Sequence, residues 1–306
     1  MEEKRIIIPR LYRRKKIQNP RQSRNFAWFL GVMAGDGSST YGDNTTNNVI
    51  RLTVTSEEFR NEFARKGQEL FGLEARGYKI FISEINPNWK DTYYAAFNSA
   101  NLIDLLGDFR SDKWMDTIKD KHPWITEKQG FIWGFLSGYF DSEGSVSNPY
   151  RLRNNAITSY ETRIRFATTY RNAAEFTVDL LNRVGIKGHI EKSTSKREGI
   201  SCVSFAKMED VKRFSENVYS FVQEKEKRLK FYRNARLVSG PSIDLTEAYN
   251  LIMKLRKETG MGSRKLAKHH LLEKYNLPHT TIQNWIYAGN NPTINGTYYK
   301  YFSLVD

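Results

Sequence analysis

Two parts of the chain share one pattern of apolar and polar positions. Residues 27–39 read AWFLGVMAGDGSS and residues 134–146 read GFLSGYFDSEGSV. Both segments carry large apolar residues at helical spacing, and both end in an acid followed by glycine, a residue that commonly stops a helix. We therefore expect two related helices, one ending near Asp36 and the other near Glu143.

Small residues recur at every fourth position of both segments. They are Ala27, Gly31 and Gly35 in the first and Gly134, Gly138 and Ser142 in the second. Residues four apart lie on one face of a helix. A glycine inside a helix costs roughly 1 kcal/mol relative to alanine, so these glycines need a reason. Close packing of the two helices supplies one and brings their acid ends together.

The predicted elements that follow each helix also correspond, so each half reads α-β-β-α-β-β-α. The first half is expected to contain a polar hairpin (38–48), a strand (49–56), a helix (57–73), strands around 78–85 and 92–97, and a helix from Ala100. The second half is expected to contain a strand pair ending at 161–169, a helix (172–184), strands at 187–193 and 200–205, and a helix (208–222). The predicted fold class is α+β, with two repeats related by a pseudo-twofold axis and antiparallel sheets.

Composition divides the chain into four expected parts. Residues 1–24 form an arm with nine basic and two acidic side chains, an arrangement that suits either contact with an anion or a plain solvated tail. Residues 25–121 and 122–238 are the two repeats. Residues 239–306 follow the linker signal Ser-Gly-Pro-Ser, at the end of a basic helix that we expect to extend through EKEKRLKFYRNARLV.

The last part is predicted to be a small all-α module of three helices, at 245–259, 263–274 and 279–288. It resembles a helix-turn-helix, in which helix three would lie in the major groove of DNA. The predicted interior residues are Leu266, Ala267, Ile282 and Trp285, and the predicted groove residues are Thr280, Thr281, Gln283 and Asn284. A merely structural three-helix cap is the alternative.

Charge and cysteine content narrow the classes of protein to which the chain can belong. The chain has 48 basic and 34 acidic residues, a formal net charge of +14, and so attracts polyanions, of which nucleic acid is the commonest. High charge that serves only solubility is the alternative. The single cysteine, Cys202, excludes an intrachain disulfide and a cysteine-rich zinc site. With no apolar run of membrane-spanning length and no signal peptide, we expect an intracellular protein without a membrane partner.

The predicted strands alternate in a way that assigns their faces. Ile50 and Leu52 alternate with Arg51 and Thr53, and residues 163–166 repeat the pattern with arginine in the polar positions. The outward faces would be basic and rich in hydroxyl groups, which suits phosphates and base edges in a DNA groove. An ordinary solvated sheet face would have the same composition.

The paired acids suggest a metal site. The C-terminus of a helix is already negative, so two carboxylates brought together there need a positive partner. Mg²⁺ is commonly held by one or two carboxylates together with water and phosphate oxygens. The alternative is two unrelated amphipathic helices that end in ordinary exposed acids.

The segments FLGVMAGDG and LSGYFDSEG resemble the two signature helices of the LAGLIDADG homing endonucleases, and the resemblance covers about residues 25–238. It implies a monomer, with no obligatory protein partner, that lays two saddle-shaped sheets in successive major grooves of double-stranded DNA. Such proteins hydrolyse both strands across the minor groove of a long target site and leave short 3′ overhangs. The resemblance implies two or more Mg²⁺ ions, with Mn²⁺ substituting and Ca²⁺ binding without cleavage.

The resemblance also assigns roles to residues. Asp36 and Glu143 would be the catalytic, metal-binding acids, with Gly35 and Ser142 as further metal ligands. Ala34 departs from the family pattern, because many members have an acid there, as Asp141 does in the second copy. The supporting catalytic candidates are Lys192, Lys207 and Arg171. The expected DNA contacts are Ser38, Thr40, Arg51, Thr53, Thr55, Lys79, Ser145, Arg151, Arg153, Arg163, Arg165, Lys187 and His189, together with Thr280, Thr281, Gln283 and Asn284.

Two other functions remain open at this point. The resemblance also extends to intron maturases, which hold structured RNA, and to regulators that join a LAGLIDADG domain to a helix-turn-helix and bind DNA without cutting it. Retention of both acids favours the nuclease. An intein is disfavoured, because its splicing chemistry needs a nucleophilic first residue and an asparagine near the end.

Overall fold

The computed structural model describes residues 16–40, 48–81, 88–110, 113–148, 150–153, 156–160, 162–191, 199–239, 246–275, 277, 279–287 and 300–304. Most of the predicted basic arm, the tip of the predicted polar hairpin and Lys192 lie outside these residues. The chain divides into two compact units, Met1–Asn234 and Ala235–Asp306, and each unit is described by itself.

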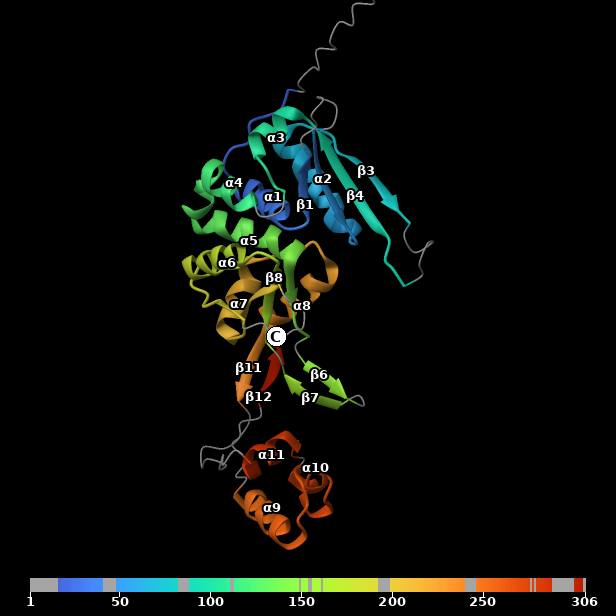
Figure 1. Cartoon of the computed structure of the whole chain (residues 1–306), viewed down its shortest axis with the longest axis vertical. Helices are drawn as coiled ribbons and strands as arrows, with labels where there is room; N and C mark the ends of the chain where they lie inside the picture. The colour runs from blue at the N-terminus through green and yellow to red at the C-terminus, as the bar shows by residue number, and fades with distance from the viewer. Residues whose placement is uncertain are drawn as a thin grey trace, which may run out of the picture. The chain divides into compact units, whose positions relative to one another are not determined.

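Two apolar helices lie at the centre of the first unit (Figure 1). Helix α1 spans Arg24–Ala34 and α5 spans Gln129–Glu143. The hydroxyl of Ser23 caps α1 by accepting a hydrogen bond from Phe26 N (3.1 Å), which satisfies one of the free amides at its start. Almost every residue of α1 is buried, as expected for a helix that is apolar on all sides. The two helices predicted from the repeated pattern are therefore present and pack against each other.

The first repeat contains a four-stranded antiparallel sheet, and its elements follow one another in the predicted order. Its elements are β1 (Gly37–Thr40), β2 (Val49–Val54), α2 (Glu57–Phe71), β3 (Arg76–Ile80), β4 (Thr92–Asn98) and α3 (Ala100–Leu106). The sheet order is β1-β2-β4-β3. Helix α2 begins after Ser56 and ends at Gly72, whose φ of 67° is a left-handed conformation that suits glycine.

The second repeat has the same sheet order, β5-β8-β10-β9. Its elements are β5 (Gly144–Val146), β8 (Ile164–Thr168), α6 (Arg171–Arg183), β9 (His189–Ile190), β10 (Ser201–Phe205) and α7 (Met208–Asn217). A separate hairpin, β6 (Tyr150–Arg153) and β7 (Ala156–Tyr160), stands between β5 and β8. The predicted fold class, with two repeats of corresponding topology, is confirmed.

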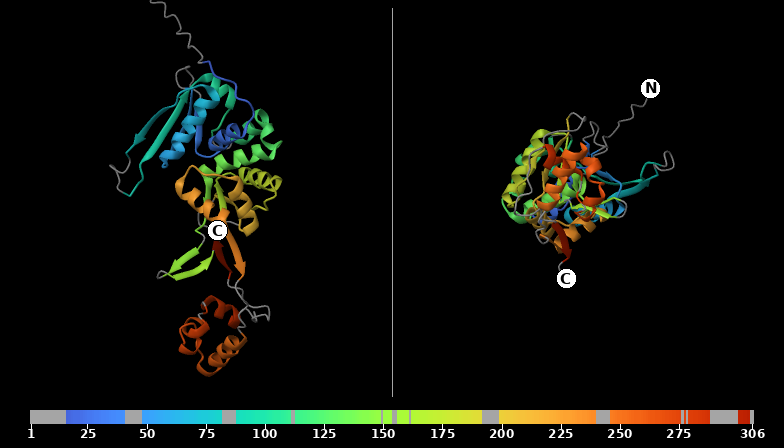
Figure 2. Two further views of the ribbon diagram at one scale, coloured as in Figure 1. Left: turned by 180° about the vertical axis from the view of Figure 1, so that it is seen from behind. Right: turned by 90° about the horizontal axis from the view of Figure 1, so that it is seen from below.

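The register of each sheet fixes which side chains share its outward face. In the first sheet Ser38 is opposite Arg51, and Thr53 is opposite Tyr94, which is opposite Tyr78. Burial along β2 alternates, with Ile50 and Leu52 fully buried. The β3–β4 hairpin extends away from the helices in both side views (Figures 1 and 2).

Several elements differ from those predicted. Helix α4 (Trp114–Lys121) and a 3-10 helix (Pro123–Thr126) connect the repeats. The helix predicted over 208–222 ends at Asn217, and a new helix, α8, begins at Gln223. The prediction of a basic helix through residue 238 was wrong at the C-terminal end. Helix α8 stops at Asn234, and Ala235–Ser239 forms a strand, β11, which pairs with β12 (Lys300–Leu304). The two strands lie about 65 positions apart in the sequence, and no local sequence pattern reveals such a long-range pairing.

The second unit contains the three predicted helical segments around a small core of its own. They are α9 (Thr246–Thr259), α10 (Ser263–Leu266) continued by a 3-10 helix (His270–Tyr275), and α11 (His279–Tyr287). Leu266, Ile282 and Trp285 are buried and Ala267 packs beside them, as predicted. The predicted middle helix was too long, because a turn at residues 267–268 interrupts it. Among the described residues, no helix of either unit has both the length and the apolar character needed to cross a membrane.

Candidate active site

The stripes of small residues form the contact between α1 and α5. A Cβ placed on Gly31 would lie 2.1 Å from the carbonyl oxygen of Phe135, and one placed on Gly138 would lie 2.0 Å from the carbonyl oxygen of Trp28. Phe135 precedes Gly138 by three positions, as Trp28 precedes Gly31. The two contacts are therefore equivalent, and the helices meet backbone to backbone about a local twofold axis. This explains the glycines that helix propensity disfavours.

The same contact brings the two predicted catalytic acids together. Asp36 follows α1 in a turn, and Glu143 is the last residue of α5. A Cβ on Gly35 would lie 3.2 Å from Cγ of Glu143, so the two helix ends touch. Burial raises the pKa of Glu143 to about 7, and the nearby negative charge of Asp36 contributes. Asp36 lies at an exposed turn, yet crowding around its carboxylate also raises its pKa, against the opposing effect of Lys225.

Each acid faces its own cavity beside the end of its own sheet. The Asp36 cavity, about 270 Å³, is lined by the end of β2 and the start of α2, residues 53–56, and by Ser142 and Lys225. The Glu143 cavity, about 510 Å³, is lined by the equivalent end of β8 and the start of α6, residues 167–170. Both cavities lie where a helix C-terminus meets its sheet.

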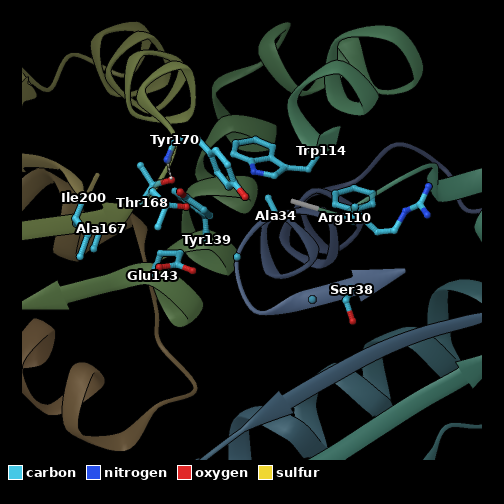
Figure 3. Close-up of a pocket in the computed structure, with 14 residues that line it drawn as sticks. Ala34, Ser38, Arg110, Trp114, Tyr139, Glu143, Ala167, Thr168, Tyr170 and Ile200 are labelled. Atoms are coloured by element: carbon cyan, nitrogen blue, oxygen red, sulfur yellow. Dashed lines mark hydrogen bonds between the residues drawn. The ribbon is translucent and has the colours of Figure 1, made fainter. Parts of the chain in front are cut away.

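Aromatic side chains form part of the wall of the Glu143 cavity. Figure 3 shows Trp114, Tyr139 and Tyr170 near Glu143, which ends its helix. Ser38 and Arg110 line the cavity from the first repeat, and the Arg110 guanidinium points away from Glu143 in this view. Arg110 is held by Asp108 through bonds of 2.9 and 2.6 Å. The two cavities therefore differ in size and in the charge that reaches them.

Lys225 is the functional residue that the sequence analysis missed. From α8 its ammonium donates hydrogen bonds to the backbone carbonyl oxygens of Phe140 (2.8 Å), Asp141 (2.7 Å) and Ser142 (3.4 Å). It therefore neutralises the negative end of α5, where two carboxylates also gather. The sequence signal that could have indicated this residue is its spacing. Lys225 lies four and seven positions before Leu229 and Tyr232, which are buried, and so shares one face of the helix with them.

Asp141, the acid without a counterpart in the first motif, lines the Asp36 cavity, but its buried carboxylate is taken up by hydrogen bonds from the protein. It accepts hydrogen bonds from Ser220 Oγ (2.5 Å), Phe221 N (3.1 Å) and Trp28 Nε1 (3.1 Å). Burial raises its pKa to about 7 despite these bonds. Asp141 thus fastens the segment before α8 to both central helices, which brings Lys225 to the acids.

The residues at the two helix ends fit a divalent metal that prefers oxygen. The expected donors are the carboxylates of Asp36 and Glu143 and the backbone carbonyls of Gly35 and Ser142, of which the Ser142 carbonyl accepts a hydrogen bond from Lys225. Within the described part of the chain, no cluster of three or more His, Cys, Asp or Glu side chains forms a complete cage. The donor set therefore suits Mg²⁺ or Mn²⁺, which retain water and take phosphate oxygens, better than a structural metal.

Two of the supporting candidates, Lys207 and Arg171, do not line either cavity. Lys207 is exposed at the start of α7, and Arg171 is exposed at the start of α6, where it pairs with Glu175 (2.9 Å). Lys192 lies outside the described residues. Neither Lys207 nor Arg171 thus has a structural argument in its favour.

Most predicted DNA contacts that the structure describes share the outward sheet faces. Ser145 is opposite Arg165, which is opposite Ser204, which is opposite His189. Arg165 donates to Glu191 (3.0 Å), and Arg51 donates to Ser38 (2.9 Å). Thr40, Thr53 and Thr55 are exposed, Lys187 is exposed beside β9, and Arg163 lies near Glu191.

The remaining predicted DNA contacts lie on another surface of the protein or outside the described residues. Lys79 lies on the other face of the first sheet, opposite Tyr93, where it pairs with Asp91 (2.9 Å). The side chains of Arg151, Arg153 and Thr280 are outside the described part. In the second unit, Gln283 and Asn284 are exposed and Thr281 is partly exposed.

Comparison with known families agrees with this geometry. Residues 130–219 match the model of the LAGLIDADG-like domain. This segment is similar to LAGLIDADG-like domains. The resemblance that the two motifs carry is thereby confirmed, and Glu143 lies within the matched domain. The first repeat shows the same sheet order around its own acid. A comparison with curated proteins finds no match.

Solved structures similar to the chain include two homing endonucleases and the protein DUF199/WhiA. The structure of I-DmoI in complex with DNA and Mn is 15% identical, with 64% of this chain and 96% of that chain covered and a TM-score of 0.43. The homing endonuclease I-WcaI bound to its DNA recognition sequence is 12% identical, with 69% and 88% covered and a TM-score of 0.49. Full-length DUF199/WhiA from Thermatoga maritima is 14% identical, with 86% and 89% covered and a TM-score of 0.45.

Proposed function

We propose that this protein is a site-specific, metal-dependent DNA endonuclease of the homing type. The observation that carries the proposal is the meeting of Asp36 and Glu143 at the C-termini of two helices in backbone contact, each acid beside its own cavity. Two acids in equivalent places suit two phosphodiester bonds, one on each strand. The outward sheet faces, with Arg51 in the first and Arg163 and Arg165 in the second, supply contacts for duplex DNA.

The chain's own residues would bind and orient the substrate. Asp36 and Glu143, with the carbonyls of Gly35 and Ser142, would hold Mg²⁺, which when bound supplies an activated water and positive charge for the departing 3′ oxygen. Lys225 adds fixed positive charge beside Asp36. The threonines at the ends of β2 and β8 line the cavities where a scissile phosphate would enter. By this proposal the protein acts as a monomer on a long duplex target and leaves short 3′ overhangs.

The test is cleavage of a plasmid that carries a target selected from a random DNA library by binding to the wild-type protein. With Mg²⁺ we expect discrete double-strand cuts. Asp36→Asn and Glu143→Gln should each slow cutting of one strand by roughly 100-fold or more while leaving binding intact. Glu175→Gln, which removes an exposed carboxylate from α6, is the matched control and should cut normally. Tight binding without any cutting by the wild type would refute the nuclease.

A regulator that binds DNA without cutting is the second candidate. The observation that favours it is Lys225, which already neutralises the helix end at which metal would bind. The separate three-helix unit would then add a second DNA contact. The same cleavage experiment separates the two functions, because a regulator gives sequence-specific binding and no cuts with Mg²⁺ or Mn²⁺.

A further inference from the structure

The ammonium of Lys225 occupies a place that is unusually rich in oxygen. The last carbonyls of a helix lack partners within the helix, and three of those at the end of α5 accept hydrogen bonds from this one group. The three donors of an ammonium match three acceptors. The ammonium also lies 5.4 Å from the centre of the Phe140 ring, a further favourable contact for a cation.

Acids surround the same ammonium. Asp141, Asp36 and Glu143 all attract it electrostatically. Two of them are the carboxylates proposed to bind metal, and the Ser142 carbonyl to which Lys225 donates is another proposed ligand. A cation that belongs to the chain thus draws on the same oxygen donors as the proposed metal.

Helix α8 holds the lysine in this position. One turn beyond it, Arg228 Nη1 donates to the carbonyl of Val146 (2.8 Å). Leu229 and Tyr232 are fully buried on the same stripe. Before the helix, Ser220 and Phe221 bind Asp141. Lys225 is therefore not a mobile surface side chain that withdraws at no cost.

The Glu143 cavity has no equivalent arrangement among its described lining residues. Arg110 is the basic side chain that reaches it, and Asp108 holds its guanidinium. Trp114 and Tyr139 form the rest of the nearby wall. Of the two cavities, the one beside Asp36 is therefore the one whose basic side chain is bound to the end of α5.

We propose that Lys225 is an internal counter-cation that competes with a divalent metal for the oxygen donors at the end of α5. The inference rests on the proposed metal-dependent function. It follows that the DNA-free protein binds metal weakly. DNA phosphates would then be needed to add the negative charge that favours a second cation beside the ammonium, so metal loading would depend on DNA.

The test measures Mn²⁺ binding to the full-length protein without DNA, from the electron paramagnetic resonance signal of free Mn²⁺. The variants are Lys225→Met, which removes the charge at similar length, and Lys225→Gln, which removes the charge but keeps an N–H donor for the carbonyls. Lys227→Met is the matched control, because it makes the same charge change at an exposed position of the same helix. We expect both Lys225 variants to bind Mn²⁺ at least about tenfold more tightly than the wild type, and the control to stay within about twofold.

Thermal unfolding provides a second measurement that needs no activity. Without metal, Lys225→Met should unfold at a lower temperature than the wild type, because the helix end loses its cation. Saturating Mn²⁺ should raise its unfolding temperature more than that of the wild type, since a ligand stabilises the state that binds it. If Lys225→Met does not fold, the Gln variant decides the question.

The outcomes separate this inference from the proposed nuclease. Unchanged or weaker Mn²⁺ affinity in both Lys225 variants, with a wild type that cuts DNA, would overturn the counter-cation and leave the nuclease standing. An equal gain in Lys227→Met would also overturn it, because the effect would then be one of net charge. A wild type that never cuts, with no Mn²⁺ binding by any variant, would overturn both.

Discussion

Glu143 is the residue whose environment most directly predicts a pH effect. Its pKa is raised from 4.5 to about 7, so the folded protein holds this proton more tightly than the unfolded chain does. The contribution of this group to stability is complete below about pH 4.5 and is lost as the pH rises through about 7. The metal-free protein should therefore lose stability relative to Glu143→Gln between about pH 5 and pH 8.

Thermal unfolding of the two proteins across this range, without metal, checks this expectation. Near pH 5 the difference between their unfolding temperatures should be small, and near pH 8 Glu143→Gln should unfold several degrees higher, because a pKa raised from 4.5 to about 7 corresponds to roughly 2–3 kcal/mol over this pH range. Asp141 titrates in both proteins, so the difference between them reports Glu143 together with its electrostatic coupling to Asp36. A constant difference at all pH values would show that the carboxyl is not protonated on folding in this way.

At the scale of elements, the contact between α1 and α5 predicts two severe alanine substitutions. Gly31→Ala and Gly138→Ala would each place a methyl about 2 Å from a backbone oxygen of the facing helix, where no side chain is free to move aside. The helices must separate, at a cost of about 3 kcal/mol or more. Denaturant unfolding followed by circular dichroism measures it.

Gly130→Ala is the control for those substitutions, because Gly130 lies in α5, as Gly138 does, with nothing within 4 Å of the added methyl. There the better helix propensity of alanine should leave stability unchanged or raise it by up to about 1 kcal/mol. Equal losses in all three variants would mean that the helix contact is not the reason for these glycines.

These elements also show what the sequence can predict. Period-four small residues, apolar helices and alternating strands are local patterns, and they predicted α1, α5 and both sheets together with the pairing of Asp36 and Glu143. The extent of α8 could not be predicted in the same way, because residues after Asn234 become a strand only through pairing with the distant β12. Lys225 was missed for a related reason: its partners are carbonyls more than eighty positions earlier, and carbonyls leave no mark in a sequence.

Face assignment succeeded where register followed simple alternation and failed for Lys79. Along residues 51–55 exposed and buried positions alternate, so the sequence pattern was enough to predict which residues face outward. All five residues of β3 are exposed, and its pattern therefore carries no information about which face is outward. Only pairing with β4 shows that Lys79 shares the face of Tyr93.

At the scale of the whole molecule, the outward face of the second sheet should set sequence preference. Arg165 lies in its central row, between Ser145 and Ser204. If its guanidinium reads a base edge, Arg165→Ala should weaken specific binding by about 1–3 kcal/mol and relax the preference at one or two positions of the target. Sequencing of DNA selected by each protein measures both. Arg171→Ala removes an exposed arginine outside the sheet and should keep the wild-type preference.

The second unit should contribute affinity rather than chemistry. Its eight buried core residues all lie within residues 248–285, and its two strands pair with each other, so its stability is expected to be its own. Residues 235–306 hold nine basic and five acidic side chains, a positive balance that favours DNA. A chain that ends at Asn234 retains both acids, both sheets and Lys225. It should therefore fold and cut at saturating concentration, but bind its target roughly tenfold or more weakly, which corresponds to ~1.4 kcal/mol.

Binding titrations at several salt concentrations distinguish the contribution of the second unit from a simple loss of charge. If α11 contacts specific bases, the truncated protein should lose preference at positions flanking the target of the two sheets, and Gln283→Ala and Asn284→Ala in the full chain should reproduce part of that loss. A purely electrostatic contribution would instead lower affinity for all DNA equally and reduce the salt dependence. Unchanged affinity and preference after truncation would make the three-helix unit a structural cap, because a unit that touches DNA cannot be removed without weakening binding.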